Sequence, residues 1–239
     1  MALSLVAAPQ QTVTIAAAAN LSDVCQTLGS QFEKETGIHP VFSFGSTAQL
    51  TQQIENGAPF DLFLAADAEH PRKLDTEYLL LPDSRVVYAT GVLVLWIPSG
   101  SHAKIERLGD LVSGDVKVIA LAKPELAPYG QAAVETLTKL GLWDHVKGKV
   151  VYADNISMAK QYGTSGNADA VFTAWSLVLT ESGRTIPVDE TLHRPISQEL
   201  GVIAKSANLP AARSFAAFLT KGKGRDILAS HGYRTDKGK

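Results

Sequence analysis

The chain has 239 residues, of which 45% are hydrophobic and 19% charged, and its formal net charge at pH 7 is −2. This length allows one large domain or two domains of about 100–120 residues, each with a proper core. The small net charge and the absence of a run of lysine or arginine argue against nucleic acid or an anionic membrane as a partner. No apolar stretch reaches the roughly 18 residues that cross a bilayer.

Two features of the N-terminal part bear on export and redox chemistry. Residues 1–9 are apolar but too short and too uncharged for a complete secretory signal, so we expect a trimmed signal remnant or an added start. Cys25 is the only cysteine, which excludes an internal disulfide. It falls on the apolar face of the first predicted helix, where we expect a small core residue and not a reactive thiol.

The first predicted unit is a strand over residues 14–19 that leads into a helix beginning at Asn20. Apolar residues recur at the helical period up to Gly37, namely Leu21, Val24, Cys25, Leu28 and Phe32. Asn20 is a typical N-cap residue. A helix start has unpaired N–H groups and partial positive charge, so it can bind an anion without a cationic side chain. Taken alone, the pattern is more typical of a turn that binds nothing.

The second unit repeats this arrangement. A short β-type run over residues 41–44 meets Gly45, Ser46 and Thr47, and a helix follows and ends at Gly57. Gly45 allows the backbone to approach a ligand closely, and the two hydroxyl residues can cap the helix and donate hydrogen bonds. The sequence therefore predicts two helix starts that could face one anion.

The third unit is a buried strand over residues 61–67, whose last residue, Asp67, is expected to cap a helix over residues 68–74. Three successive strand–helix units imply parallel pairing and an α/β fold. The apolar stretch over residues 86–97 is too long for one ordinary strand. We interpret it as two strands, or as one bent strand that passes into a second domain.

The second half of the chain continues the pattern. Strands are predicted over residues 116–122, 150–152 and 168–175. The loops after the first two of these strands, at residues 123–130 and 153–157, lead into helices and supply a third and a fourth helix start.

A strand over residues 199–204 is expected to cross back to the first domain, with two helices after it, over residues 211–219 and 224–230. This organisation predicts a first lobe formed by residues 10–89 and 201–239. The second lobe, residues 90–200, is inserted and joined by two crossing strands.

Seven short motifs occur in order, with specific spacing, over most of residues 12–235: AAAANL (16–21), FGSTAQL (44–50), IENGAPFDLFLAAD (54–67), APYGQAA (127–133), TKLGLWD (138–144), ADNISMA (153–159) and NADAVF (167–172). Single motifs are weak signals, but the ordered set resembles the molybdate-binding proteins of bacterial ABC importers. The resemblance implies a two-lobed α/β type II periplasmic-binding-protein fold. Its ligand cleft lies between the lobes, and two crossing strands act as the hinge.

The resemblance also implies ligand-binding positions in the first lobe. The family's small polar residue at the first helix start falls on Asn20, beside Ala19, and would supply its N–H and its amide NH₂. The family's serine in the second loop falls on Thr47, which keeps the hydroxyl group. The neighbouring Ser46 is a further candidate.

In the second lobe, the family's two backbone N–H donors fall on Tyr129 and Ile156. Some members carry a tyrosine on a strand near the end of the cleft. Here that position is Thr173, a departure from the pattern that stays a candidate contact, and Tyr129 is the phenol that would take its place.

The function that the resemblance implies is extracytoplasmic binding of molybdate or tungstate and delivery to the membrane permease of an ABC importer. We expect a periplasmic monomer without cofactor or catalytic residue. Molybdenum would be present only within the oxyanion, with no direct protein ligand. The implied positions agree with this chemistry, because a desolvated tetrahedral dianion needs donors and no nearby carboxylate, and none of the positions is Asp or Glu.

Two alternatives remain open. The same fold supports a receptor for sulfate, another oxyanion or a small organic acid. Since molybdate and tungstate differ from sulfate mainly in size, the choice depends on the cavity volume. An enzyme is the second alternative, but the six histidines are scattered, and the chain has no zinc motif, nucleophile elbow or phosphate-binding loop.

Overall fold

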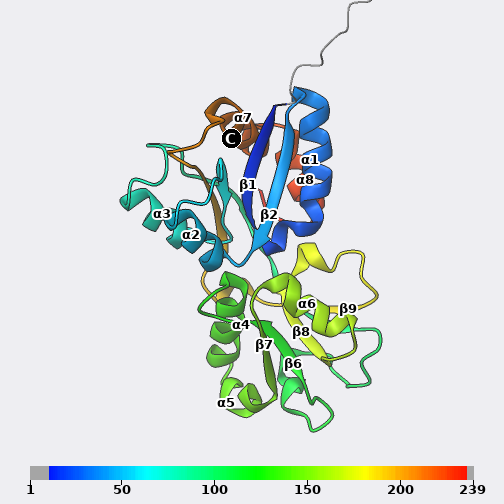
Figure 1. Cartoon of the computed structure of the whole chain (residues 1–239). Helices are drawn as coiled ribbons and strands as arrows, with labels where there is room; N and C mark the ends of the chain where they lie inside the picture. The colour runs from blue at the N-terminus through cyan, green and yellow to red at the C-terminus, as the bar shows by residue number, and fades with distance from the viewer. Residues whose placement is uncertain (1–10, 236–239) are drawn as a thin grey trace, which may run out of the picture.

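The computed structural model describes residues 11–235. The expectations for residues 1–9 lie outside the described residues. Within the described part, none of the helices has the length and apolar character needed to cross a membrane. The described strands form two five-stranded sheets, one above the other in Figure 1.

The first sheet contains β1 (Thr12–Ala18), β2 (His39–Gly45), β3 (Leu62–Leu64), β4 (Val86–Thr90) and β10 (Ser197–Val202). Its order is β2-β1-β3-β10-β4. Strand β1 is parallel to β2 and β3, whereas β10 is antiparallel to β3 and β4. The parallel strands are the ones that lead into helices, as three successive strand–helix units predict.

The second sheet contains β5 (Leu93–Pro98), β6 (Ile119–Ala122), β7 (Val150–Ala153), β8 (Ala170–Ala174) and β9 (Gly183–Pro187). Its order is β7-β6-β8-β5-β9. Strand β6 is parallel to β7 and β8, and β5 is antiparallel to β8 and β9. The two sheets thus share one plan, a parallel part followed by antiparallel strands.

The helices connect and cover the strands. The α-helices are α1 (Ser22–Thr36), α2 (Thr47–Glu55), α3 (Glu69–Thr76), α4 (Pro128–Lys139), α5 (Trp143–Val146), α6 (Ile156–Thr164), α7 (Leu209–Lys221) and α8 (Lys223–Ser230). Short 3₁₀ turns are η1 (Ala19–Leu21), η2 (Leu108–Val112), η3 (Lys147–Lys149), η4 (Trp175–Leu177) and η5 (Glu190–Leu192).

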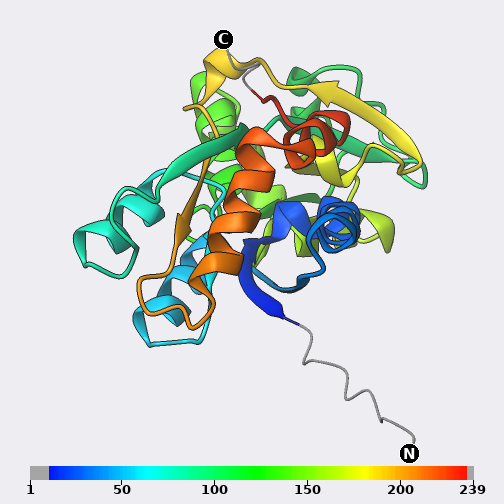
Figure 2. The ribbon, with the colours of Figure 1, turned by 90° about the horizontal axis from the view of Figure 1, so that it is seen from above.

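The first sheet is packed on both faces because the side chains of β1 alternate. Val13, Ile15 and Ala17 face the layer formed by α1, α7 and α8, and Ala16 faces α2 and α3. Phe32 of α1 meets Phe215 of α7 edge-on, with ring centroids 4.8 Å apart. Seen from above, α7 lies alongside the sheet with α8 next to it (Figure 2). Cys25 is buried in this layer, and desolvation raises the pKa of its thiol, as expected for an inert core residue.

The stretch over residues 86–97 is two strands, β4 and β5, in different sheets, which confirms the first of its two interpretations. Other predicted elements differ in the structure. The third strand is only Leu62–Leu64, shorter than the predicted residues 61–67. Strand β9 and helix α5 were not predicted, because β9 is a mostly exposed edge strand without an apolar run and α5 is a single turn.

The chain passes from the first sheet to the second between β4 and β5, and it returns with β10. Gly91 lies in the first crossing, and its N–H donates to the carbonyl of Ile196 just before the second crossing strand, at 2.9 Å. The crossings are therefore joined to each other. The division into lobes at residues 89 and 200 stays a prediction.

Replacing Gly130 by alanine is expected to lower the free energy of unfolding. A Cβ on Gly130, in the first turn of α4, would come within 2.0 Å of the carbonyl oxygen of Ala122. Backbone atoms cannot give way as a side chain can, so we expect Gly130→Ala to cost about 1–3 kcal/mol. Gly148→Ala is the control, because a Cβ there meets nothing within 4 Å. Urea unfolding measures both, and equal stability of the two variants would contradict this packing.

Candidate functional site

A small cavity lies where the ends of strands from both sheets face each other. Its volume is about 10 Å³ as measured by the centre of a water-sized sphere, which is about the room that one water molecule needs. Backbone and small side chains form most of its wall. The lining residues are Ala18, Ala19, Asn20, Gly45, Ser46, Thr47, Ala66, Ala127, Pro128, Tyr129, Asn155 and Ile156.

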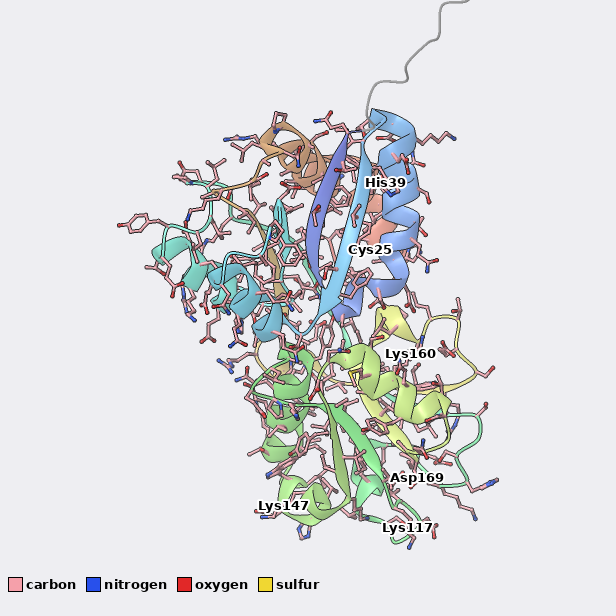
Figure 3. All side chains as sticks on the ribbon, in the orientation of Figure 1. Cys25, His39, Lys117, Lys147, Lys160 and Asp169 are labelled. Carbon is pink, nitrogen blue, oxygen red and sulfur yellow. The ribbon has the colours of Figure 1, made fainter. Side chains whose placement is uncertain are left out.

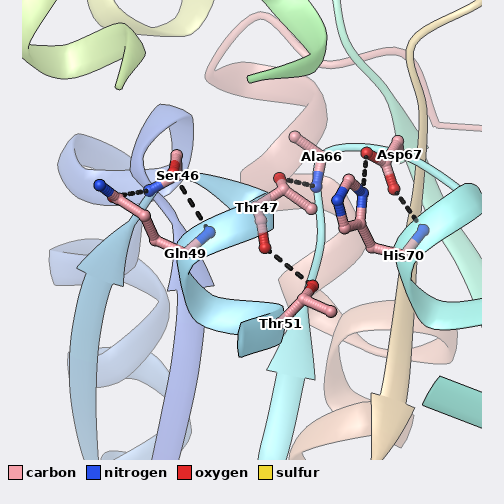
Figure 4. A network of polar contacts seen from close by, with 7 residues as sticks. All are labelled: Ser46, Thr47, Gln49, Thr51, Ala66, Asp67 and His70. Atoms are coloured by element: carbon pink, nitrogen blue, oxygen red, sulfur yellow. Dashed lines mark hydrogen bonds and ion pairs between the residues drawn. The ribbon is translucent and has the colours of Figure 1, made fainter. Parts of the chain in front are cut away.

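The start of α2 forms one side of the cavity. Ser46 is the N-cap: its hydroxyl accepts from the N–H of Gln49, and the Gln49 side chain accepts from the N–H of Ser46, each at 3.3 Å (Figure 4). The predicted cap at Ser46 is thus confirmed. This capping box fixes the direction in which the first N–H groups of α2 point.

Thr47 is the first residue of α2 and is buried. Its hydroxyl oxygen accepts a hydrogen bond from the N–H of Ala66 at 3.2 Å (Figure 4). Among the described residues, none accepts the hydroxyl hydrogen. Thr47 can therefore donate this hydrogen to a ligand while Ala66 holds the oxygen in place.

Asn20 has a different local role from the predicted one. Helix α1 begins after the turn η1, the residue at its N-cap is Leu21, and no side chain caps either element. The prediction of Asn20 as an N-cap is wrong, because its amide turns inward and bonds to the side chains of Gln198 and Tyr233, both at 3.1 Å. Its Oδ1 atom is buried without a hydrogen-bond partner. The residue nevertheless lines the cavity.

The starts of α4 and α6 form the opposite side. Pro128 is the first residue of α4 and has no N–H, so the N–H of Tyr129 is the first of that helix. Ile156 is the first residue of α6, and Asn155 caps this helix by accepting from the N–H of Met158 at 2.9 Å. Early N–H groups of a helix have no acceptor within the helix. Both helices thus present donors to the cavity.

The electrostatics of the cavity favour an anion, although no charged side chain is among its described lining residues. Helix starts carry partial positive charge. The one titratable lining side chain in the described structure, Tyr129, is buried, and desolvation raises its pKa well above the usual value, so the hydroxyl stays protonated. A wider hollow beside the cavity is lined by Asp67, Glu69 and Glu125, whose carboxylates would repel an anion. We therefore assign the site to the small cavity.

Asp67 lies just outside the cavity and caps α3, though one residue ahead of the position that the structure defines as the N-cap. Its Oδ1 accepts from the N–H of His70 at 3.0 Å, and its Oδ2 bonds to the His70 ring at 2.7 Å (Figure 4). Burial disfavours the charged imidazole, but the bond and charge of Asp67 outweigh this, and the pKa of His70 is raised. The carboxylate is thereby held by α3 and His70.

Contacts between segments of the two sheets close the cavity. The N–H of Ala48, at the start of α2, donates to the carbonyl of Leu126 before α4, at 3.2 Å. At the edge, Lys160 of α6 contacts Asp23 of α1 at 3.4 Å, and Figure 3 shows Lys160 at this junction. Lys160 is mostly buried and also pairs with Glu181 at 2.7 Å, so the longer contact with the half-exposed Asp23 is expected to add little stability.

The structure brings together the residues proposed from the sequence, with one exception. The lining includes Ala19, Asn20, Ser46, Thr47, Tyr129 and Ile156. Thr173 is not part of the lining; it is the next-to-last residue of β8, is buried, and has a hydroxyl without a hydrogen-bond partner among the described residues. The Tyr129 hydroxyl was expected to replace the tyrosine that some family members have at the Thr173 position. Instead, its oxygen accepts a hydrogen bond from Nε2 of Gln198 at 2.9 Å.

Sequence reasoning missed the residues behind the lining. Gln198 is completely buried and bonds to Asn20, Tyr88 and Tyr129, and Tyr233 bonds to Asn20 from the C-terminal segment. The sequence around Gln198 and Tyr233 has no pattern that predicts hydrogen bonds between these side chains and Asn20. Gln198 lies one residue before the crossing strand predicted over residues 199–204, whereas the observed strand begins at Ser197 and includes it. In residues 11–235 no group of three or more His, Cys, Asp or Glu side chains could hold a metal ion.

Comparison with known proteins agrees with this geometry. Residues 13–234 match the family model described as bacterial extracellular solute-binding protein. The molybdate-binding protein ModA of Azotobacter vinelandii is 38% identical over 95% of this chain and 91% of its own length. ModA of Rhodobacter capsulatus is 35% identical over 99% and 93%.

The solved structure of the Azotobacter vinelandii periplasmic molybdate-binding protein superposes with a TM-score of 0.90 at 31% identity. The match covers 94% of this chain and 100% of that protein. The two-lobed α/β fold expected from the sequence is confirmed. The chain belongs to the bacterial extracellular solute-binding protein family.

Proposed function

We propose that this protein binds molybdate or tungstate outside the cytoplasm and delivers it to the permease of an ABC importer. The observation that carries the proposal is a small cavity to which helix starts from both sheets, together with hydroxyl and amide side chains, supply donors. Among residues 11–235, no charged side chain lines it. The molybdate-binding relatives, similar over nearly their whole length, support the choice of ligand.

The chemistry of the cavity suits a fully ionised tetrahedral anion. An enclosed dianion loses most of its hydration, so each oxygen needs donors from the protein. Thr47 offers a hydroxyl, and Tyr129 and Ile156 offer backbone N–H groups at helix starts. A protonated phosphate would also need an acceptor for its O–H, and no carboxylate lines the cavity in the described residues.

Sulfate is the second candidate, since it presents the same charge and geometry to these donors. Molybdate and tungstate are larger than sulfate, so the two classes differ in how well they fill one rigid cavity. Small organic acids are less well matched, because an apolar or extended body has little room in a volume of this size.

Binding would act by stabilising the closed arrangement. An anion that contacts Thr47 on one side and Tyr129 and Ile156 on the other has higher affinity for the closed form than for an open one. The closed form would then dock on the permease in the periplasm as a monomer. No resident cofactor and no catalytic step are part of this proposal, in which molybdenum occurs only as the oxyanion.

Isothermal titration with molybdate, tungstate, sulfate and phosphate in separate runs tests the ligand. We expect binding heats with molybdate and tungstate, weaker or absent heats with sulfate, and none with phosphate. Tight binding of sulfate with no binding heat from molybdate would move the assignment to sulfate. If none of the four anions gives a binding heat, in folded protein freed of ligand by unfolding and refolding, the oxyanion site is refuted.

Thr47→Val is expected to weaken molybdate binding about 10- to 100-fold, because it removes one donor to a charged group at nearly constant volume. Thr47→Ser keeps the hydroxyl and should retain most of the affinity. Thr51→Val is the matched control: Thr51 is also buried in α2, donates to the carbonyl of Thr47 at 2.8 Å, and does not line the cavity. Equal affinities of the Thr47→Val and Thr51→Val variants would contradict the contact.

The affinity for molybdate is expected to stay constant between about pH 6 and pH 9. Tyr129 is the one titratable side chain among the described lining residues, and burial raises its pKa well above the usual phenol value. A raised phenol pKa keeps the neutral form at higher pH, so this residue does not change charge within that range. Titrations at several pH values check this, and a tenfold change would indicate a charged group that contributes to the site.

A further inference from the structure

A buried network of side chains lies directly behind the cavity and is centred on Gln198 of β10. Gln198 has no exposed surface. Its Oε1 accepts from Nδ2 of Asn20 at 3.1 Å and from the Tyr88 hydroxyl at 2.9 Å, and its Nε2 donates to the Tyr129 hydroxyl at 2.9 Å. The Tyr233 hydroxyl donates to the carbonyl oxygen of Asn20 at 2.7 Å. The network joins the first sheet to α4.

With the Asn20 and Gln198 side chains oriented in this way, several hydrogen-bond donors share one acceptor or have none. The single hydroxyl hydrogen of Tyr88 faces two acceptors, Oε1 of Gln198 and the carbonyl of Ala65 at 3.0 Å. The hydroxyl hydrogen of Tyr129 and the second Nε2 hydrogen of Gln198 meet no acceptor among the described residues. Oδ1 of Asn20 is buried without a partner. A buried polar atom left unpaired costs stability, so the arrangement calls for an explanation.

Exchanging the oxygen and nitrogen positions of both amides resolves most of these mismatches. Amide oxygen and nitrogen have nearly the same shape, so their positions are decided by the hydrogen-bond network. After the exchange, Tyr129 donates to Oε1 of Gln198. Nε2 of Gln198 donates to Oδ1 of Asn20 and to the Tyr88 oxygen, and Tyr88 donates to Ala65 alone. One hydrogen bond is lost in the exchange: Nδ2 of Asn20 no longer donates to the Tyr233 hydroxyl, because Oδ1 takes its place 3.1 Å from that oxygen and the Tyr233 hydrogen still goes to the Asn20 carbonyl.

The exchange also changes what Asn20 offers to the cavity. Its NH₂ group takes the position in which Oδ1 has no partner, on a residue that lines the cavity. A donor at this position has no acceptor within the described protein, and an oxyanion would supply one. The carbonyl orientation would instead direct a partial negative charge at the anion.

We propose that Gln198 is a positioning residue that holds the Asn20 amide with its NH₂ group directed to the anion. This inference rests on the proposed function and adds to it a residue that does not line the cavity. Because Tyr129 belongs to α4 and Gln198 to β10, their contact ties the orientation of the Asn20 amide to the opposite side of the cavity.

The close packing at Gly91 agrees with this role. A Cβ at Gly91 would lie 2.2 Å from the Tyr129 hydroxyl oxygen and 2.7 Å from the terminal nitrogen position of Gln198. The Tyr129–Gln198 contact therefore fills the space beside Gly91, and only glycine fits at this position. A side chain on the first crossing would separate the two residues that the proposal connects.

A double-mutant cycle tests the proposal, with molybdate as the titrant in all titrations. Gln198→Met keeps the length of the side chain and removes its hydrogen bonds, and Asn20→Ala removes the amide that it positions. We expect each single variant to bind about tenfold more weakly or worse. If Gln198 acts through Asn20, the double variant binds as Asn20→Ala does, within about twofold. If the two losses of molybdate affinity multiply in the double variant, or if Gln198→Met binds molybdate with wild-type affinity, the proposal is overturned.

Ser84→Ala is the control for a general loosening of β10. The Ser84 hydroxyl accepts from the N–H of Val202 on this strand at 3.1 Å and does not take part in the network. We expect it to lower the free energy of unfolding without changing molybdate affinity. A loss of affinity equal to that of Gln198→Met would show that strand stability, and not amide orientation, controls binding.

A measurement on the wild-type protein covers the case in which Gln198→Met does not fold. In the nuclear Overhauser spectrum of uniformly labelled protein, the side-chain NH₂ of Gln198 should give stronger contacts to the ring of Tyr88 than to that of Tyr129. The Asn20 NH₂ signals, identified by their absence in Asn20→Ala, should shift on addition of molybdate. Stronger contacts from the Gln198 NH₂ to Tyr129 than to Tyr88 would overturn the proposal.

Failure of this proposal and failure of the proposed function give different results. If wild-type protein binds none of molybdate, tungstate and sulfate, the proposed function fails, and the role of Gln198 fails with it. If wild-type protein binds molybdate and the cycle is additive, the proposed function stands and only the role of Gln198 is refuted.

Discussion

The site depends on one property of helices: their first N–H groups have no acceptor within the helix. In a parallel sheet, each strand is followed by a helix that begins at the carboxyl edge, so neighbouring helix starts gather at one edge. This chain builds two such sheets and turns these edges toward each other. Backbone donors from α2, α4 and α6 thus converge on one small volume, and no cationic side chain of the described residues lines it.

A site without charged side chains has a physical advantage for a binding protein that must also release its ligand. A buried cation facing an anion would gain a strong interaction, but it would be left desolvated and unpaired when the ligand leaves. Donors at helix starts return to water when the cavity opens. The small side chains of the lining, among them Ala18, Ala66 and Ala127, let the backbone approach closely enough for its N–H groups to serve as the main contacts.

Much of this arrangement could be predicted from the sequence, because the elements that form the site have strong local signals. The run before Gly45 and the hydroxyl pair Ser46 and Thr47 predict a strand, a cap and a helix start, and the structure has all three. Periodicity up to Gly37 predicts α1, and Gly37 ends it in the left-handed conformation. The ordered motifs and their resemblance to a family then related the separate helix starts to one cleft.

What could not be predicted depends on contacts between residues far apart in the chain. Asparagine is a typical N-cap residue type, but the terminal nitrogen of Asn20 bonds to Gln198 and Tyr233, which are 178 and 213 residues away in the chain. No local pattern contains that information, so propensity gave the wrong role to the right residue. Thr173 was carried over from a family position, yet in this chain β8 keeps the residue inside the sheet, away from the cavity.

The same long-range contacts bear on selectivity. Anions of equal charge and shape can be distinguished only if the cavity keeps its size, and a wall of helix starts alone could shift by tenths of an ångström at little cost. Gln198, Tyr88 and Tyr129 form a buried layer behind the wall, and hydrogen bonds tie this layer between the first sheet and α4. Because interiors of this kind are close-packed and yield little, the layer fixes the distance between the two halves of the cavity. Size selection would then reside in residues that never touch the anion.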